Sequence, residues 1–484
     1  ALAFADDLMI FGESPQDAQE RLQVTQKYLS ALGMEVAASK SVAFHIRARH
    51  KTWSLEDPDA QIFGGAIPGL RSDQSLRYLG ISYSPWRGFD ALDLPANFED
   101  ALGRVKGAAL KPYQKLHLWQ AYIQPHFLHQ LALAMPPRGA LERLDVAVRA
   151  MVKSIFHLPR CITDGVLYCR PRDGGLGLQR LSQLVPRVAL ALGCRMARSE
   201  DSFCGDILRC QETESRLKRA AAASRIIWPC NLEDVVSLKK RQLKAEFARW
   251  TSLGCQGKAA LAHGNDPVGN AFLAKPTLLK QCRLVTALQL RTDTAGNRTA
   301  LNRAIPQKDV SCRRCHAAPE TLGHILGLCV CTKSARIHRH DEIKHFIEAR
   351  LLEQRGTTVS TEVSLSLPDG SKLKPDLIVL NEEGAFVVDV TVRHEGGDGL
   401  ERGAAEKIRK YRPALPVAAQ LLRAESASVL PIVVGDTGAM PPQTIAALKR
   451  LGISADMHMR TISLVALRSS IEIYHMFMDY DGVG

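Results

Sequence analysis

The pattern of apolar and polar positions predicts short strands and one amphipathic helix in the first hundred residues. Residues 1–11 are apolar except for two adjacent carboxylates, Asp6 and Asp7, which predicts two buried strands joined by a turn. Ser14-Pro15 is a typical helix start, and the apolar stripe that follows predicts a helix as far as about Leu32. A strand is expected after Gly33, and a compact hairpin at 77–81. The expected inward-facing helix positions are Ala18, Leu22, Thr25, Tyr28, Leu29 and Leu32.

The rest of the chain divides into a helical part and a strand-rich part. From about residue 98 to 260 the pattern is helical. Near the C-terminus, the runs 377–380 and 385–392 flank an acidic turn and predict a hairpin, which a strand at 429–434 and a helix at 442–451 would complete as an α/β core. The sequence therefore predicts a multidomain α+β protein, and the four expected domains are 1–97, 98–260, 261–345 and 346–484.

Length and composition are those of an ordinary globular protein. The chain has 484 residues, 46% hydrophobic and 23% charged, which suits about two to four domains. No apolar stretch approaches the roughly 18 residues that a membrane span needs, so no membrane partner is expected. No targeting signal is visible. Twelve cysteines with one Cys-x-x-Cys favour a reducing compartment and a metal site over disulfides.

Charge is distributed unevenly along the chain. The number of Lys and Arg residues minus the number of Asp and Glu residues is −5 for residues 1–100, +21 for 101–350 and −3 for 351–484. These values sum to the net charge of +13. A basic middle between two acidic ends is expected if nucleic acid runs between metal-dependent sites. A set of solvated helix faces is the alternative interpretation.

The carboxylate pair near the N-terminus predicts a metal site. Adjacent carboxylates in apolar surroundings need a cation to offset their repulsion. Mg²⁺ takes oxygen ligands and normally brings a phosphate with it. Asp6 and Asp7 are therefore candidate magnesium ligands.

The motifs Phe-Ala-Asp-Asp, Gly-Met-Glu-Val-x-x-Ser-Lys and Tyr-Leu-Gly-Ile follow one another at residues 4–7, 33–40 and 78–81. This order resembles the second half of a reverse transcriptase palm of non-LTR retrotransposons. The resemblance implies that Asp6 and Asp7 bind metal, that Lys40 approaches the triphosphate of a deoxynucleotide, and that the turn at 78–80 grips the primer end. Two-metal phosphoryl transfer also needs carboxylates from a separate strand. We expect that strand upstream of Ala1, so the chain as given is expected not to polymerise.

Basic residues in the middle of the chain are candidates for phosphate contact. In the family that the palm resembles, the helical part would be the thumb, and the turn at 171–178 also recurs there. The aromatic residues between 117 and 127 are expected in helix cores rather than against bases. A charged helix face is the alternative for the second basic segment, 278–303. The candidates are Lys106, Lys111, Lys115, Lys280, Arg283, Arg291 and Arg298.

A cysteine and histidine pattern predicts a structural zinc site. The spacing Cys-x2-Cys-x8-His-x4-Cys in residues 312–329 supplies four ligands of the types that Zn²⁺ prefers. Four protein ligands leave no open position for catalysis, so the metal would serve to fold a segment too small for its own core. The predicted ligands are Cys312, Cys315, His324 and Cys329.

Alternatives for this segment stay open. The cysteines would be buried without a metal in one interpretation, and His316, Cys331 or His338 could replace a ligand in another. Basic residues flank the pattern and suggest that it also contacts phosphate. They are Arg313, Arg314, Lys333, Arg336 and Arg339.

Two carboxylates of the C-terminal hairpin predict a further metal site. Asp376 opens the first strand and Asp389 stands towards the end of its antiparallel partner, with twelve residues between them. A hairpin brings such positions together, so the two carboxylates can share a divalent cation such as Mg²⁺. Asp389 stands between Val388 and Val390, which argues against the alternative of surface charges.

The pattern Pro-Asp-x12-Asp resembles the core of restriction-enzyme-like PD-(D/E)XK nucleases. In that family a Lys normally stands two positions after the second acid, but here Thr391 does. Lysines relocated to the following helix resemble the endonuclease of site-specific retrotransposons, and Lys407 and Lys410 are the candidates. A metal-activated water would attack a phosphodiester while Lys stabilises the developing charge. Glu395 is a candidate for a further ligand.

The order of palm, thumb, zinc knuckle and nuclease resembles the retrotransposons that insert into large-subunit ribosomal RNA genes of arthropods. The resemblance implies the C-terminal part of an enzyme with RNA-directed DNA polymerase and DNA endonuclease activities, made in the cytoplasm and acting in the nucleus. The nuclease would nick double-stranded ribosomal DNA, and the polymerase would copy element RNA from the nick. Two alternatives stay open: a nucleic-acid-binding remnant with both sites inactive, and an unrelated zinc-containing repair or recombination nuclease.

Overall fold

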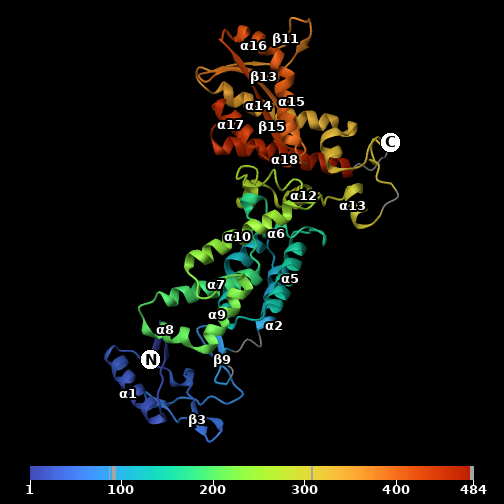
Figure 1. Ribbon diagram of the computed structural model, residues 1–484. Coiled ribbons are helices and arrows are strands. Elements are labelled where there is room, and N and C mark those ends of the chain that lie inside the picture. Colours follow the sequence, from blue (N-terminus) through green and yellow to red (C-terminus); the bar gives the residue numbers. More distant parts are fainter. Residues whose placement is uncertain (87, 90–93, 307–308, 480–484) are drawn as a thin grey trace. The chain divides into compact units, whose positions relative to one another are not determined.

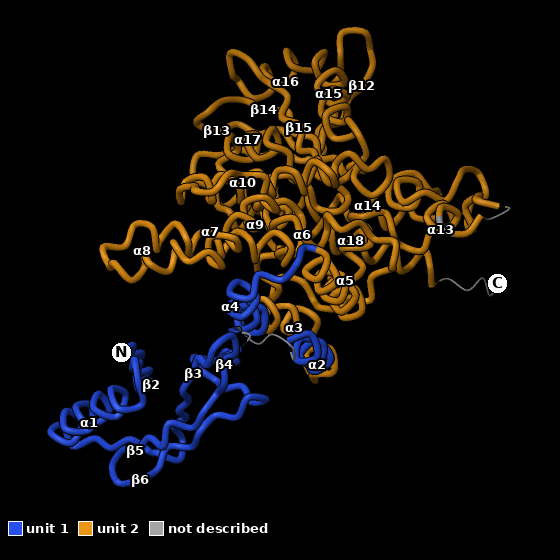
Figure 2. Tube along the Cα trace, turned by 60° about the horizontal axis from the view of Figure 1, so that its bottom comes forward, with its two compact units in different colours: residues 1–104, 121–138 blue, residues 105–120, 139–484 orange. Residues whose placement is uncertain are grey.

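The chain folds into two compact units. The computed structural model describes residues 1–86, 88–89, 94–306 and 309–479. Unit 1 comprises residues 1–104 and 121–138, and unit 2 comprises residues 105–120 and 139–484 (Figures 1 and 2). Within the described part, no helix is long and apolar enough to cross a membrane.

Unit 1 consists of short strand pairs and a long helix. β1 (Leu2–Phe4) and β2 (Asp7–Met9) form an antiparallel hairpin, and α1 (Pro15–Ala31) follows, capped by the side chain of Ser14 as the sequence predicts. A small core forms around Ala60, Ile62 and Ile67. The other elements are η1 (Ala38–Lys40), β3 (His45–Arg49), β4 (Thr52–Glu56), β5 (Gln61–Ile62), β6 (Gly65–Ala66), β7 (Leu76–Tyr78), β8 (Ile81–Ser84), β9 (Gly88–Phe89), the start of α2 (Leu94–Gly107), the end of the π-helical turn η2 (Trp119–Ile123) and α4 (Gln124–Ala134).

Burial in unit 1 differs from the prediction. The hairpin at 76–84 is confirmed, with Leu79 and Gly80 at positive φ in its turn. The predicted burial of the first strand pair is wrong, because β1 and β2 form a sheet of only two strands and Phe4 is 65% exposed. The expected stripe of α1 is also too long, since Tyr28 and Leu32 are exposed while the other four positions are partly buried. No strand forms at 34–37.

The first part of unit 2 is helical, as predicted for residues 98–260. Pro171, Gly174 and Gly177 shape the turn that precedes α7, with both glycines at positive φ. The elements of this part are α3 (Pro112–Leu118), α5 (Arg138–Ile155), α6 (Gly165–Tyr168), η3 (Pro171–Asp173), α7 (Leu181–Ala197), α8 (Ser202–Arg209), α9 (Gln211–Ser224) and α10 (Leu232–Thr251).

A connecting segment of short helices follows and ends in one long helix. The connecting helices are α11 (Ala271–Ala274), η4 (Pro276–Leu278), α12 (Gln281–Arg291), α13 (Arg298–Ala304), the π-helical turn η5 (His324–Leu328) and η6 (Val330–Thr332). α14 (Lys333–Leu352) then runs without a break through residues 345–346, where the sequence analysis put a domain boundary. Ile343, Ile347 and Leu351 of α14 belong to the core of the strand-rich part, so this helix is shared by both predicted domains.

The strand-rich part is a four-stranded sheet in the order β10-β13-β14-β15. β10 (Thr358–Thr361), β13 (Leu377–Asn381) and β14 (Gly384–Arg393) pair antiparallel, and β15 (Ala427–Gly435) joins β14 in parallel. Pro431 has no backbone N–H to donate within β15. An edge strand tolerates this loss. The predicted hairpin, third strand and helix are therefore confirmed. The remaining elements are β11 (Leu365–Ser366), β12 (Lys372–Leu373), α15 (Gly399–Tyr411), η7 (Arg412–Ala414), α16 (Leu415–Leu422), α17 (Pro442–Arg450) and α18 (Asp456–Asp479).

Helices cover both faces of this sheet, so it is the middle layer of three (Figure 1). Phe386, Val388 and Val390 of β14 pack into the core that contains α14, α17 and α18. Ala385 and Val387 pack on the opposite side with Tyr411 and α16. By the two-residue period of a strand, Asp389 faces the side covered by α15 and α16. This alternation directs the candidate catalytic carboxylate towards α15.

Candidate metal centres

The two carboxylates predicted to form a nuclease site lie on neighbouring strands. Leu377 pairs with Val388 in the antiparallel register, so Asp376 and Asp389 occupy the next pair of positions. Asp389 is 3% exposed. Asp376 Oδ2 accepts a hydrogen bond of 2.7 Å from the backbone N–H of Val390. The structure thus brings together the two carboxylates that the hairpin pattern predicts to meet.

Of the two candidate lysines, Lys407 faces these carboxylates. Its Nζ lies 2.6 Å from Asp389 Oδ2, and both side chains are largely buried. Lys410 Nζ donates instead to the Tyr411 hydroxyl at 3.0 Å. Burial and the neighbouring Asp389 raise the pKa of Tyr411, which keeps it a neutral phenol, and it donates to the backbone oxygen of Lys374. The geometry therefore favours Lys407 over Lys410.

His340 of α14 is a site residue that the sequence analysis missed. Its Nε2 lies 3.1 Å from Asp376 Oδ2 and 3.1 Å from Val390 O, and its Nδ1 lies 3.0 Å from Asp341 Oδ1. The hydrogen bond with Asp376 raises the pKa of His340 to about 9, despite burial. Burial alone would raise the pKa of Asp376. The hydrogen bond and charge of His340 lower this pKa by more than burial raises it, so the net shift is downward. No spacing pattern signals this residue, because its partner is 36 positions away.

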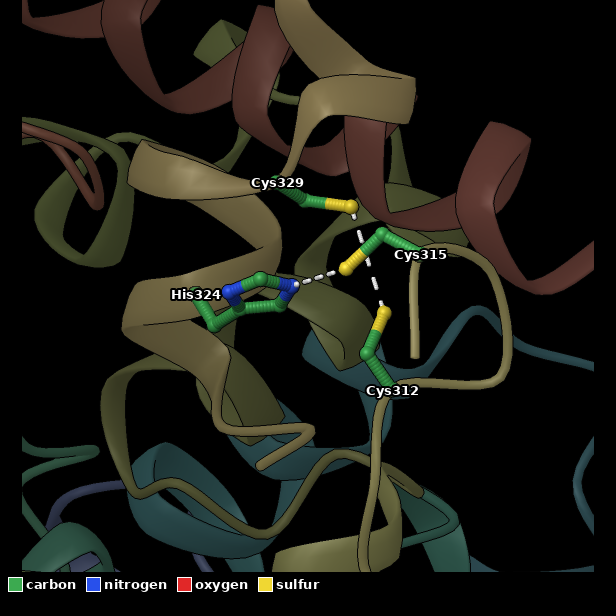
Figure 3. A group of neighbouring side chains, drawn as sticks. All are labelled: Cys312, Cys315, His324 and Cys329. Carbon is green, nitrogen blue, oxygen red and sulfur yellow. Dashed lines mark hydrogen bonds between the residues drawn. The ribbon is translucent and has the colours of Figure 1, made fainter. Parts of the chain in front are cut away.

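The four predicted zinc ligands gather at one point (Figure 3). Cys312 Sγ lies 3.9 Å from Cys329 Sγ, and Cys315 Sγ lies 3.2 Å from His324 Nε2. Tetrahedral Zn²⁺ with Zn–S bonds of about 2.3 Å separates two sulfur ligands by about 3.8 Å, so the sulfur pair has the spacing of a zinc site. All four ligand atoms lie within 4.8 Å of one another. The donor set and its dimensions both fit a closed site for Zn²⁺.

The protonation of these ligands is set by their surroundings. Burial lowers the pKa of His324, which favours the neutral imidazole that binds metals. A hydrogen bond from the backbone of Ala317 lowers the pKa of Cys315. Burial raises the pKa of Cys329 to about 12, so this thiolate needs a cation beside it. His316, Cys331 and His338, the alternative ligands, are exposed and outside the cluster.

Most basic residues around the cluster bind protein rather than solvent. Arg313 pairs with the buried Glu320 at 2.7 Å, and Arg314 donates to the backbone of Phe477 at the end of α18. Arg336 donates to the carbonyls of Gly327 and Cys329, and buried Arg339 donates to Leu326 O. The predicted phosphate contacts of Arg336 and Arg339 are therefore corrected: these guanidinium groups hold the backbone of the cysteine cluster against α14.

The other predicted phosphate contacts differ in exposure. Lys106, Lys111 and Lys280 are exposed, while Lys115 donates to Lys106 O. Arg291 is 3% exposed and donates to Asn270, Gly269 O and Thr437 O, so its predicted phosphate contact is wrong. A guanidinium that is buried among protein acceptors is not accessible to phosphate.

Two further arginines of the connecting segment form ion pairs but remain partly exposed. Arg283 pairs with Glu472 at 2.7 Å, and Arg298 pairs with Asp309 at 2.9 Å. Both side chains keep about a third of their surface exposed. They can exchange these exposed partners for phosphate at small cost.

The first carboxylate pair lies in a different environment. Asp6 and Asp7 are exposed in the hairpin of β1 and β2, where Ala5 takes a φ of 52°. Within the described residues, neither Asp6 nor Asp7 belongs to a group of three or more acid, Cys or His side chains with metal-ligand geometry, and the same holds for Asp376 and Asp389. Lys40 ends η1 and is exposed. Of the predicted polymerase residues, the structure thus shows the Asp-Asp turn but not a completed site.

Glu395 lies in a second buried polar cluster rather than at the nuclease carboxylates. Its Oε1 accepts from the backbone and hydroxyl of Thr437, and His394 Nδ1 lies 3.0 Å from Asp436 Oδ2. Asp436 raises the pKa of His394 to about 9, and burial raises the pKa of Glu395 well above its usual value. Ligand atoms of His394, Glu395 and Asp436 lie within 4.8 Å of one another, so this group has the dimensions of a metal site, while His394 and buried Arg339 lower the pKa of Asp436.

Comparisons with known proteins identify the N-terminal part and the relatives of the whole chain. Residues 1–83 match the family model described as reverse transcriptase (RNA-dependent DNA polymerase). The chain is 25% identical to the retrovirus-related Pol polyprotein from type-2 retrotransposable element R2DM of Drosophila melanogaster, over 100% of the chain and 45% of that protein. It is 27% identical to a Pol polyprotein from type-1 retrotransposable element R2 of Popillia japonica, over 98% of the chain and 97% of that protein.

The chain therefore spans less than half of the Drosophila relative but nearly all of the beetle one. A Pol polyprotein from a type-1 R2 element of Nasonia vitripennis is 23% identical over 82% of the chain and 37% of its own length. These matches run across both units and agree with the resemblance seen in the motifs. The chain is thus similar over nearly its whole length to Pol polyproteins of R2 retrotransposable elements, and its first 83 residues match a reverse transcriptase family model.

Proposed function

We propose that the chain is a piece of an R2-type Pol polyprotein whose C-terminal part is a metal-dependent DNA endonuclease. The observation that carries this proposal is the cluster of Asp376, Asp389 and Lys407 on one α/β core. In metal-dependent phosphodiester hydrolysis, carboxylates can hold the ion and a lysine can stabilise the negative charge that develops on the phosphate. Target double-stranded DNA, with ribosomal DNA as the sequence class, would be the substrate.

The carboxylates fit Mg²⁺, because the site offers acid oxygens and no soft ligand. Bound there, Mg²⁺ would activate a water and offset the charge on the phosphate. Lys407 would donate to a phosphate oxygen as negative charge develops. Asp376 would be held in position by the Val390 N–H and by His340, which leaves one of its oxygens for the metal.

The test is nicking, by the whole chain with Mg²⁺, of a supercoiled plasmid that carries a ribosomal DNA segment. We expect open circles from the wild type and none from Asp376→Ala or Asp389→Ala. Asp369→Ala is the matched control, because Asp369 is an exposed turn carboxylate of the same domain whose loss leaves the nuclease core untouched. Nicking that survives both active-site substitutions would refute the assignment, and so would nicking that persists with the metal chelated.

The target distinguishes the remaining candidates. Nicking confined to a ribosomal DNA segment supports an R2-type endonuclease, which would act in the nucleus after synthesis in the cytoplasm. Nicking of any plasmid at equal rates favours an unrelated repair or recombination nuclease. Binding without nicking favours an inactive remnant.

The reverse transcriptase sequence supports RNA-directed DNA synthesis by the larger protein, with element RNA as template. In-line phosphoryl transfer needs carboxylates from two strands around two metal ions. We propose that Asp6 and Asp7 supply one part of that set and Lys40 contacts the triphosphate. Primer extension by this chain alone should therefore be absent.

The Cys312, Cys315, His324 and Cys329 cluster supports a structural zinc ion. Its role would be to fix the connecting segment against α14, since Arg336 and Arg339 already join the two. Metal analysis of the purified chain should give about one zinc per molecule. Exposed basic residues, chiefly Lys106, Lys111 and Lys280, would contact nucleic acid, with smaller contributions from Lys115, Arg283, Arg298, Arg313 and Arg314.

A further inference from the structure

A cavity of about 230 Å³ lies in the helical part of unit 2, far along the chain from both carboxylate pairs. It is bordered by the turn before α7, by α7 itself and by α10. The turn belongs to the glycine-rich motif at 171–178, whose role the proposed function does not explain. The polar residues that line it and carry the inference are Arg170, Gln179, Arg180, Arg187, Lys239 and Gln242.

Arg187 is a charged group held by neutral partners. Its guanidinium donates to the side-chain oxygens of Gln242 at 2.7 Å and Gln179 at 3.0 Å. Within the part of the chain that the structure describes, no ion pair involves Arg187. Burial lowers the pKa of this guanidinium without removing its charge. A partly buried cation with only amide partners attracts an anion strongly, because little water screens it.

The carboxylate that lines the cavity is already engaged. Glu246 accepts two hydrogen bonds from Arg180, at 3.1 and 2.9 Å, and also pairs with Arg249. Arg180 in turn stacks over the ring of Tyr168, 3.9 Å from its centroid. Such a bidentate pair is rigid and leaves the carboxylate no free lone pair facing a ligand. Glu246 therefore orders the floor of the cavity and does not neutralise Arg187.

The lining is rich in donors and poor in acceptors. Four cationic side chains and one carboxylate line the cavity, but Arg170 pairs with Asp173 and Arg180 with Asp164 and Glu246. Among the described residues, Arg187 and Lys239 are thus the lining cations for which no ion pair is found. The side-chain oxygen of Gln242 faces Arg187, because a guanidinium can only donate hydrogen bonds. The amide N–H groups of Gln242 are then further donors beside Arg187. A ligand whose surface consists of acceptors and negative charge matches this lining, and phosphate is the biological group of that kind.

We propose that this cavity binds a phosphate group of a nucleic-acid strand. Arg187 and Lys239 are the recognising cations, with Arg170 at the rim. The choice of a strand rests on the proposed function, since an R2-type protein handles RNA and DNA. It also rests on the exposed side chains of Arg170 and Lys239, which extend the positive lining to the surface of a segment whose net charge is +21. The affinity for phosphate itself does not depend on nuclease activity.

The experiment measures binding of a short fluorescein-labelled single-stranded RNA to the whole chain by fluorescence anisotropy. Arg187→Gln and Lys239→Gln should each weaken binding about tenfold. Each should also reduce the slope of log affinity against log salt by roughly 0.7, because one phosphate contact is lost. Arg195→Gln, on the same helix but outside the cavity, makes the same change in charge and should alter neither value.

Inorganic phosphate serves as a second probe. In the wild type it should compete with the RNA, and in Arg187→Gln it should compete only weakly. The proposal would be overturned if Arg187→Gln and Lys239→Gln both bound RNA with the same affinity, and the same dependence of affinity on salt, as Arg195→Gln. Phosphate binding that depends on Arg187 without any effect on RNA would overturn the assignment to a strand. Because Lys239 is exposed, its variant tests the cavity even where Arg187→Gln fails to fold. Nicking of plasmid is scored separately, so loss of one activity is not mistaken for loss of the other.

Discussion

The chain contains two carboxylate pairs in contrasting surroundings. Asp6 and Asp7 are adjacent in sequence, exposed, and located in a sheet of two short strands. Asp376 and Asp389 come from neighbouring strands of a four-stranded sheet, where Asp389 is buried and paired with Lys407. The evidence for the first pair is a sequence match, because it lies in the segment that matches a reverse transcriptase model. The evidence for the second pair is the arrangement of its side chains.

The difference shows that recognition and completeness are separate properties of a site. A motif is recognisable from a few residues in a row, but a working metal site also needs neighbours that fix its ligands. The second pair has such neighbours in His340, Val390 and Lys407.

Loss of the cysteine cluster should have the largest effect on stability. A structural zinc ion contributes on the order of 10 kcal/mol of folding free energy in small zinc domains. Cys312→Ser should abolish zinc binding and lower the unfolding temperature of the strand-rich part. The two are linked because Arg336 and Arg339 of α14 donate hydrogen bonds to the backbone of the cluster. Metal analysis and calorimetry check this. Cys282→Ser, at an exposed cysteine outside the cluster, is the control; equal zinc content in the two variants would contradict the assignment.

Lys407 should matter far more than Lys410. Removing an electrostatic donor to a developing charge costs roughly 10²–10³ in rate. We therefore expect Lys407→Ala to lose nicking by that factor, with partial recovery in Lys407→Arg. Lys410→Ala should stay within a few-fold of wild type, since Lys410 faces Tyr411. Initial rates of plasmid nicking measure both, and the reverse order would show that the ion pair with Asp389 is not the productive arrangement.

His340 should act through Asp376 and not on the substrate. Residues that orient a metal ligand typically change metal affinity by about 10–100-fold. His340→Ala should therefore raise the Mg²⁺ concentration needed for half-maximal nicking by about tenfold, and His340→Gln, which keeps a side-chain donor, should restore part of it. A merely structural role would lower the amount of folded protein and leave the Mg²⁺ requirement unchanged.

A smaller, pH-dependent effect is expected from the second buried cluster. His394 has its pKa raised to about 9 by Asp436, above the value of about 6.5 in an unfolded chain. Its stabilising contribution is therefore complete below about pH 6.5, declines as pH rises and is lost above about 9. His394→Gln should lower the urea midpoint most below about pH 6.5, and the effect should fade as pH rises and be small above about pH 9. A constant difference across this range would exclude the ion pair as the cause. The side chain is partly exposed, so solvent screening keeps the effect small.

The elements of both regions were predictable to different degrees. The hairpin at 377–393, the strand at 427–435 and the helix at 442–450 follow from local alternation and turn residues, which operate over few positions. Burial of β1 was not predictable, because it depends on which strands lie beside it. The gathering of Cys312, Cys315, His324 and Cys329 was predictable from spacing, since metal geometry limits the separation of ligands.

Other site features depend on distant contacts. His340 meets Asp376 only because α14 packs across the sheet, and no pattern in either segment indicates this. Arg291 has the composition of a phosphate contact, but the loops that contain Asn270 and Thr437 bury it. The choice between Lys407 and Lys410 likewise requires the orientation of α15. Sequence reasoning therefore found the ligands and missed the residues that hold them.

The most direct test compares both carboxylate pairs in one assay. Plasmid nicking with Mg²⁺ is measured for the wild type, for the double variant Asp6→Ala with Asp7→Ala, and for Asp376→Ala with Asp389→Ala. We expect the first double variant to nick like the wild type and the second to lose at least about 10²-fold in rate. Equal loss in both, or nicking that depends on Asp6 and Asp7 alone, would contradict the claim that the distant pair forms the endonuclease site.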